Sequence, residues 1–201
     1  MIRYLPLLFP LALANCGDIL ASIEALERAD ELERLEALIA NSDESGLAPL
    51  SDTEILSRNG TVSYPGQAAI VIPGNNSPDY VFSARANINA DFATNTLTAQ
   101  FNDWIGYQDG DNLAESSVQG GVTFSDGVIG GPDFAAQISG NVTGDITADG
   151  RNVTVDGVME GQISSFDGGE GIGALTVAEQ TTITQNGVVI PDAEFGFAGE
   201  R

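Results

Sequence analysis

The 201-residue sequence has no lysine and no histidine, and its seven basic residues are all arginine. Without lysine, the chain has no amine for a Schiff base and no lysine for a phosphate-binding loop. Without histidine, it has no imidazole for general-base catalysis or for metal ligation. The two absences exclude the enzyme classes that depend on these side chains.

Cysteine is also scarce, since Cys16 is the sole example and it directly follows an apolar segment. This position argues against a thiol nucleophile or a thiolate metal site. Carboxylates, hydroxyls and the three tyrosines beyond residue 16 remain, so a hydrolase that uses a carboxylate pair is one hypothesis, although no motif brings two carboxylates together. We therefore expect no catalytic residue, no metal ion and no cofactor.

Acidic residues dominate the charge, with a formal net charge of −22. From residue 60 onward, the sequence contains 18 acidic residues and only three arginines. Such a surface repels nucleic acid and anionic lipid, and we expect no nucleic-acid partner. The excess favours solubility, and attraction to a basic partner is the alternative interpretation.

The first 16 residues have the pattern of an export leader. Arg3 supplies a positive start, and residues 5–14 form an apolar stretch that is too short to span a bilayer. The stretch ends at residues 13–16 (LANC), which resemble the lipobox of bacterial lipoproteins, although Asn15 stands where that family usually has a smaller residue. The resemblance implies cleavage after residue 15 and lipidation of Cys16. An ordinary leader that is cut nearby, leaving a free thiol, is the alternative.

Residues 16–59 are predicted to connect this anchor to a folded domain. Asp18 is a suitable cap for a helix over residues 19–40, which are rich in leucine, alanine, glutamate and arginine. Two apolar stripes on this helix are rotated relative to each other, so a continuous coiled coil is not expected. Residues 41–59 have the composition of a polar linker.

From residue 60 to residue 201, alternating apolar and polar residues predict β-strands. The clearest strand is residues 81–92, and a short turn at residues 93–95 leads into the next apolar face, as in a hairpin. Further strands are expected at 60–72, 117–125, 133–144, 152–164, 172–182 and 193–200, separated by Gly-, Asp- and Asn-rich turns. We therefore predict an all-β fold, an eight-stranded antiparallel up-and-down β-barrel preceded by an N-terminal α-helical tether. A β-sandwich remains the alternative.

Five segments of the predicted barrel carry a family resemblance. They are residues 64–68 (YPGQA), 90–98 (ADFATNTLT), 138–144 (ISGNVTG), 158–163 (VMEGQI) and 195–201 (FGFAGER). In this order, they resemble the C-terminal barrel of transferrin-binding protein B-like surface lipoproteins, in their short single-barrel version. The resemblance implies an exported lipoprotein in the outer membrane, displayed at the cell surface. Transferrin binding is not carried over, because no residues match the handle domain that captures it.

Two groups of residues are candidate sites. Asp109, Asp111 and Glu115 offer oxygen ligands for calcium, but their spacing is not that of an EF-hand, and a solvated turn is the simpler interpretation. Trp104, Ile105 and Tyr107 are expected to plug one end of the barrel, with an exposed interaction patch as the alternative.

Three functions are compatible with these features. The leading hypothesis is a non-enzymatic module that binds an unknown protein or small molecule and attaches to a membrane through Cys16. A lipocalin-like carrier of a small apolar ligand is the second, and it requires a cavity inside the barrel. The acidic-pair hydrolase is the third.

Overall fold

The computed structural model describes residues 26–28, 30–31, 48–74, 77–108, 115–166 and 169–201. The predicted leader, Cys16 and most of the predicted tether helix lie outside these residues. Residues 26–28 and 30–31, which belong to that tether, are helical. Among the described residues, no helix is both long enough and apolar enough to cross a membrane.

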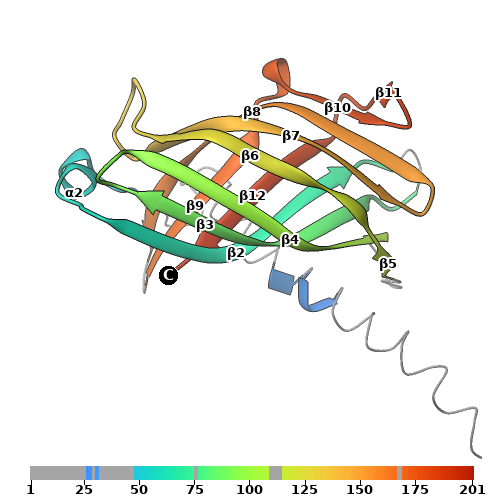
Figure 1. Cartoon of the computed structure of the whole chain (residues 1–201), viewed down its shortest axis with the longest axis horizontal. Coiled ribbons are helices and arrows are strands. Elements are labelled where there is room, and N and C mark those ends of the chain that lie inside the picture. The colour runs from blue at the N-terminus through green and yellow to red at the C-terminus, as the bar shows by residue number, and fades with distance from the viewer. Residues whose placement is uncertain (1–25, 29, 32–47, 75–76, 109–114, 167–168) are drawn as a thin grey trace, which may run out of the picture.

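The fold is almost entirely made of β-strands (Figure 1). The long strands are β2 (Thr61–Ile72), β3 (Tyr80–Asp91), β4 (Thr96–Gln108), β6 (Gln119–Ile129), β7 (Gln137–Ala148), β8 (Arg151–Phe166), β9 (Gly169–Thr176) and β12 (Glu194–Glu200). The short elements are β1 (Ala48–Pro49), α2 (Asp52–Leu56), β5 (Ser116–Ser117), the 3-10 helix η1 (Ala178–Gln180), β10 (Thr182–Gln185) and β11 (Val188–Val189).

The eight long strands close into an antiparallel barrel. They follow one another in the order β2-β3-β4-β6-β7-β8-β9-β12, and β12 pairs with β2 to complete the ring. This confirms the predicted eight-stranded barrel and excludes the sandwich. The hairpin predicted at residues 93–95 connects β3 to β4, and Asn95 adopts the left-handed backbone conformation that such a turn requires.

The barrel interior is filled by the apolar face of each strand. Alternate residues of the strand predicted at 81–92 share its apolar face and are all buried in the main core: Phe82, Ala84, Ala86, Ile88, Ala90 and Phe92. Phe197 is fully buried, with its ring centroid 5.8 Å from that of Phe101 and 5.4 Å from that of Phe124. Phe195 packs edge-on against Phe101 at 5.4 Å. Outward-facing residues of the same strands, such as Arg85, Asn141 and Thr143, are exposed.

A β-bulge at Asp103 changes the position of the predicted aromatic plug. The β3–β4 register shifts between Ser83 and Arg85, and Asp103 has a positive φ of 53°. The extra residue turns Trp104 inward, where its ring packs against Phe101 and Phe195. Ile105 and Tyr107 instead join Ala69 and Val81 in a second, separate apolar cluster. Trp104 thus packs against the interior core, whereas the expected interior position is wrong for Ile105 and Tyr107.

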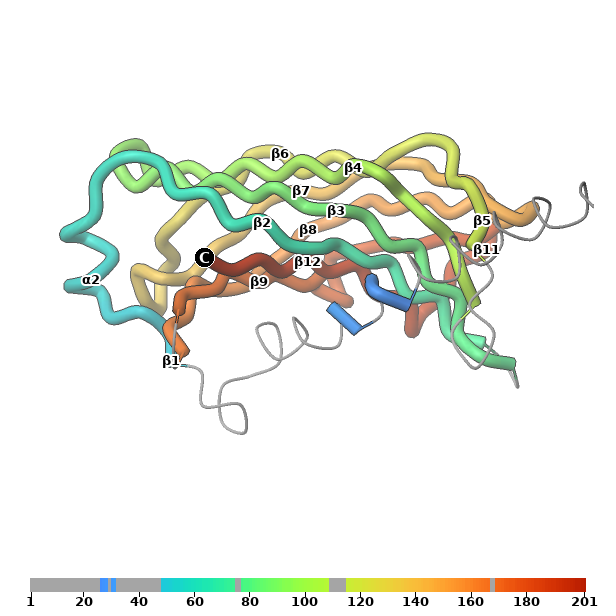
Figure 2. Tube along the Cα trace, turned by 90° about the horizontal axis from the view of Figure 1, so that it is seen from below, coloured from blue at the N-terminus to red at the C-terminus, as the bar shows by residue number. Residues whose placement is uncertain are grey.

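The two ends of the barrel are built differently (Figure 2). At one end, here called the helix end, α2 covers the opening and buries Ile55 in the core, while β1 pairs with the end of β8. At the other end, here called the hairpin end, β10 and β11 form a hairpin outside the barrel, on the edge of β8. Residues 48–58 are therefore part of the folded barrel, although the sequence indicates a polar linker there.

Candidate functional site

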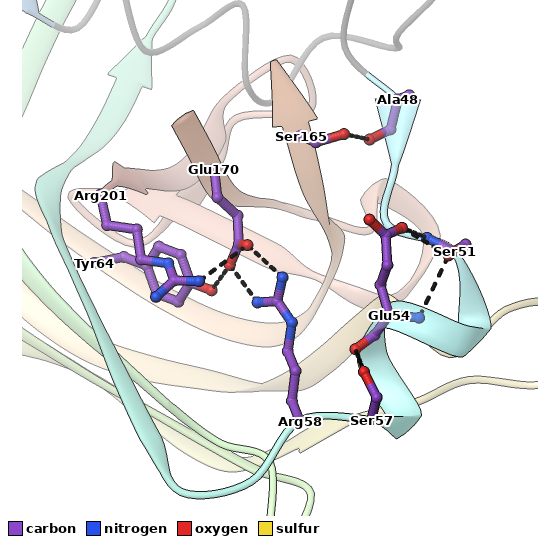
Figure 3. A network of polar contacts seen from close by, with 9 residues as sticks. All are labelled: Ala48, Ser51, Glu54, Ser57, Arg58, Tyr64, Ser165, Glu170 and Arg201. Atoms are coloured by element: carbon purple, nitrogen blue, oxygen red, sulfur yellow. Dashed lines mark hydrogen bonds and ion pairs between the residues drawn. The ribbon is translucent and has the colours of Figure 1, made fainter. Parts of the chain in front are cut away.

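A buried carboxylate, Glu170, organises the helix end of the barrel (Figure 3). It lies near the start of β9, and its side chain points into the end of the barrel. Arg58 follows α2, Tyr64 lies in β2, and Arg201 follows β12. The site thus joins Arg58 and Tyr64, which are close in the sequence, to Glu170 and Arg201, which lie much later in the chain.

The short helix α2 places Arg58 at this site. Ser51 caps its start, because the Ser51 hydroxyl accepts from the Glu54 amide and the Glu54 carboxylate accepts from the Ser51 amide at 2.9 Å. Ser57 ends the helix, and the next residue is Arg58. The capped helix therefore fixes the direction in which the chain continues, and with it the position of the Arg58 guanidinium at the end of the barrel.

The Glu170 carboxylate accepts hydrogen bonds from three side chains. Arg58 donates in a bidentate manner, with Nη1 2.6 Å from Oε1 and Nη2 2.5 Å from Oε2. The Tyr64 hydroxyl donates to Oε1, and Arg201 Nη2 donates to Oε2 at 3.2 Å. Both carboxylate oxygens therefore have charged or hydroxyl donors, an arrangement we call the Glu170 clasp.

The protonation states of the Glu170 clasp suit a structural role better than proton transfer in catalysis. Burial raises the pKa of Glu170, but the hydrogen bonds from Arg58, Tyr64 and Arg201 outweigh it and leave the pKa below its ordinary value. Burial, followed by the hydrogen bond to Glu170, raises the pKa of Tyr64. Glu170 thus stays charged and Tyr64 stays protonated around neutral pH. A carboxylate with a lowered pKa and with both oxygens occupied is a poor general base.

The hairpin end carries the more accessible candidate surface. A groove of about 530 Å³ lies between the β2–β3 loop and the β10–β11 hairpin, lined by residues that include Pro73, Pro78 and Val188. A second groove of about 440 Å³ lies on the η1 side of the hairpin, and residues 189–192 line both grooves. The hairpin therefore stands between two hollows.

Two adjacent valines are exposed on this hairpin. Val188 and Val189 have 64% and 57% of their surface exposed. The turn before them is Asn186-Gly187, both with positive φ, as in the tight turns that favour two-residue hairpins. These two valines place exposed apolar side chains beside the grooves that flank the hairpin.

A polar cluster borders the first groove. The Tyr80 hydroxyl donates to Asp149 Oδ2 at 3.0 Å, and Ser116 donates to the same oxygen at 2.5 Å. The Arg151 guanidinium lies 4.1 Å from the centroid of the Tyr80 ring. Burial raises the pKa of Tyr80, so its hydroxyl remains a donor. The surface therefore combines apolar side chains with one cation and a fixed aromatic ring.

Comparison with family models, curated proteins and solved structures finds no match to this chain. The functional interpretation therefore depends on the sequence features and on the geometry of the barrel.

The calcium hypothesis is not tested by the described residues. Asp109 and Asp111 lie outside them, and Glu115 is half-buried. Within the described ranges, no three potential metal ligands cluster. The sequence-based interpretation missed the clasp and the exposed hairpin. The hairpin had a local signal, since the Asn-Gly pair at residues 186–187 is followed at once by the apolar residues 188–190.

Proposed function

We propose that this chain is a lipid-anchored, surface-exposed bacterial lipoprotein whose barrel binds a partner, without catalysis, at the hairpin end. The observation that carries the proposal is the pair of exposed valines on a hairpin between two grooves. Binding residues are often presented on loops that a rigid scaffold positions, and the closed barrel is such a scaffold. The groove beside Val188 has a volume within the range of ligand-binding pockets, and its partner is a protein segment or a small molecule.

The anchor in this proposal is Cys16. The lipobox-like residues 13–16 support lipidation, and the polar outward-facing residues of β3, β4 and β7 support a barrel held in water beside the membrane. The resemblance to transferrin-binding protein B-like barrels supports display at the outer membrane. Capture of transferrin is not part of the proposal.

The other two functions receive less support. A lipocalin-like carrier needs space inside the barrel, and the described interior is occupied by aromatic rings in contact with one another. A hydrolase needs two carboxylates with a free oxygen each, whereas Glu170 is bound by two arginines and a tyrosine.

Charged substitutions on the hairpin test the binding surface. We expect the double variant Val188→Asp/Val189→Asp to lose at least about tenfold in affinity for the partner, because two carboxylates replace an apolar contact that binding would desolvate. The measurement is quantitative affinity capture, after chemical cross-linking, from cells that naturally make the protein. The captured amount is compared, between the variant and the unsubstituted chain, only for proteins that the unsubstituted chain enriches.

A matched control adds the same two charges elsewhere. Thr98→Asp/Gln100→Asp lies on exposed positions of β4, on the outer wall. We expect this variant to retain the same partners as the unsubstituted chain. Equal capture by both double variants would contradict a binding site at the hairpin.

Mass spectrometry of the mature N-terminus tests the anchor. The expected result is an acylated Cys16 as the first residue, with the barrel removed by protease treatment of intact cells. A mature chain that begins elsewhere, with a free Cys16 thiol or none, would contradict lipidation.

A further inference from the structure

Four apolar residues on the outer wall of the barrel are buried, although their side chains point away from the core. Ser83 precedes the exposed, outward-facing Arg85 by two residues, so it also faces outward, and it pairs with Ala69 in β2 and Ile105 in β4. Ala69 and Ile105, together with Val81 and Tyr107, form the second apolar cluster, and all four are almost fully buried. The polar residues Gln67 and Ser83 on the same face are buried too.

The helical residues 26–28 and 30–31, here called the strap, contact this wall. In Figure 2 the strap lies against the outside of the barrel, near β2 and β12. Arg28 is only 2% exposed, and its Nη1 donates to the backbone carbonyl of Asp103 at 2.6 Å and to that of Ser83 at 3.4 Å. The Ser83 carbonyl belongs to the strand position between Ala69 and Ile105, so Arg28 is anchored at the centre of the buried patch.

The bulge in β4 supplies the acceptor for Arg28. Asp103 is skipped in the β3–β4 register, and its positive φ reorients the peptide group. The displaced carbonyl forms the shorter of the two hydrogen bonds with Arg28. A second contact continues along the wall, because Gln67 Nε2 donates to Glu31 Oε2 at 2.6 Å and Ser83 donates to Gln67 Oε1 at 3.0 Å. The outer wall thus supplies hydrogen-bond partners for two strap residues, Arg28 and Glu31.

We infer that the outer wall of β2, β3 and β4 is a docking site for the strap, and that this contact shortens the tether between the barrel and Cys16. Arg28 lies 12 residues after Cys16, whereas Ala48, where the barrel begins, lies 32 residues after it. At full extension these segments reach about 40 Å and about 110 Å. Docking therefore limits how far the hairpin end can move from the membrane. The docking itself is independent of the proposed function, but the effect on reach depends on the lipid anchor.

Hydrogen–deuterium exchange of the full chain tests the docking. We expect Arg28→Glu to accelerate exchange of the strap amides by about tenfold or more, because the substitution replaces a donor with an acceptor opposite two carbonyls. Most helical stability in proteins comes from packing, so the released strap loses its protection. Exchange in β7, on another part of the barrel, serves as the reference for an intact fold. Unchanged strap exchange with a protected β7 would overturn the inference.

Two further variants keep this experiment decisive. Glu27→Ala changes an exposed strap residue and is expected to leave exchange unchanged. If Arg28→Glu also exposes β7, Glu31→Ala takes its place, since it removes the carboxylate that accepts the hydrogen bond from Gln67. We expect faster strap exchange in Glu31→Ala with a protected β7, and unchanged strap exchange would overturn the inference.

Energy transfer on vesicles tests the effect on reach. The lipid-attached chain is placed in phosphatidylethanolamine–phosphatidylglycerol vesicles with an acceptor dye on the headgroups and a donor on Thr143→Cys, an exposed position of β7. We expect lower transfer efficiency for Arg28→Glu than for the parent chain. Equal transfer, with the strap released by exchange and Cys16 acylated by mass spectrometry, would overturn the shortened tether. Absence of the acyl group would contradict the proposed function and leave the docking result valid.

Discussion

Replacing Glu170 with alanine is expected to lower the free energy of unfolding by about 3 kcal/mol. The substitution leaves Arg58, Arg201 and the Tyr64 hydroxyl at the helix end without their shared acceptor. It also removes the ion pair that joins Arg58, just after α2, to β9. Urea unfolding followed by the fluorescence of Trp104, the single tryptophan, measures the loss.

A control on the neighbouring strand separates this effect from a general effect of removing charge. Glu160 lies on β8 with its side chain exposed. We expect Glu160→Ala to change the free energy of unfolding by less than about 0.5 kcal/mol. Similar losses in the two variants would show that the clasp contributes no specific stability.

The difference in unfolding free energy between the parent chain and Glu170→Ala is expected to depend on pH, with a sign that follows from the pKa of Glu170. The pKa of Glu170 is below its ordinary value of 4.5 in the folded chain. Its stabilising contribution is therefore complete above about pH 4.5 and is lost as the pH falls through the folded-state pKa. We expect the stability difference between the parent chain and Glu170→Ala to be constant near neutral pH and to shrink under more acidic conditions. A difference that stays constant at low pH would contradict a charged clasp.

Replacing Gly161 with alanine is expected to cost about 3 kcal/mol of stability. A Cβ atom at this position would lie 1.9 Å from the carbonyl oxygen of Gly173 and 2.6 Å from the Cα of Ala174. Both atoms belong to the backbone of β9, so no side-chain rotation relieves the contact. The β8–β9 pair must separate locally, and this pair is one of the seams that close the barrel. Thermal and urea unfolding measure the loss.

Another strand glycine provides the matched control. Gly121 in β6 has nothing within 4 Å of a Cβ built on its backbone. We expect Gly121→Ala to leave the stability unchanged or slightly increased, because alanine loses less conformational entropy than glycine on folding. If the two alanine variants were equally stable, the close approach of β8 and β9 at Gly161 would be disproved.

The strands were predictable because their signals are local. Alternation placed a strand at residues 81–92, against Tyr80–Asp91 in the structure, and the Asp-Gly and Asn-Gly pairs marked the turns at residues 149–150 and 186–187. Closure into a barrel followed from the number of strands and from the absence of helical segments between them. These inferences needed only neighbouring residues.

The site residues were not predictable in the same way. The clasp joins Arg58 and Tyr64 to Glu170 and Arg201, and no sequence spacing indicates a contact between two regions so far apart in the chain. The bulge at Asp103 was missed because strict alternation assumes an uninterrupted register, and one extra residue reverses the faces of those that follow. Residues 48–58 read as a linker because only two of their side chains, Leu50 and Ile55, enter the core.

The pairing of β12 with β2 has a consequence for the order in which the chain acquires its structure. This seam brings Val71 beside Glu194 and Gly66 beside Gly199, so it can form only after β12 has been synthesised. Contacts between such distant residues form slowly, because the intervening chain must first be ordered. Until then the sheet retains two unpaired edges and an uncovered aromatic core. A protein built in this way becomes a cooperative unit only after its last strand has been made.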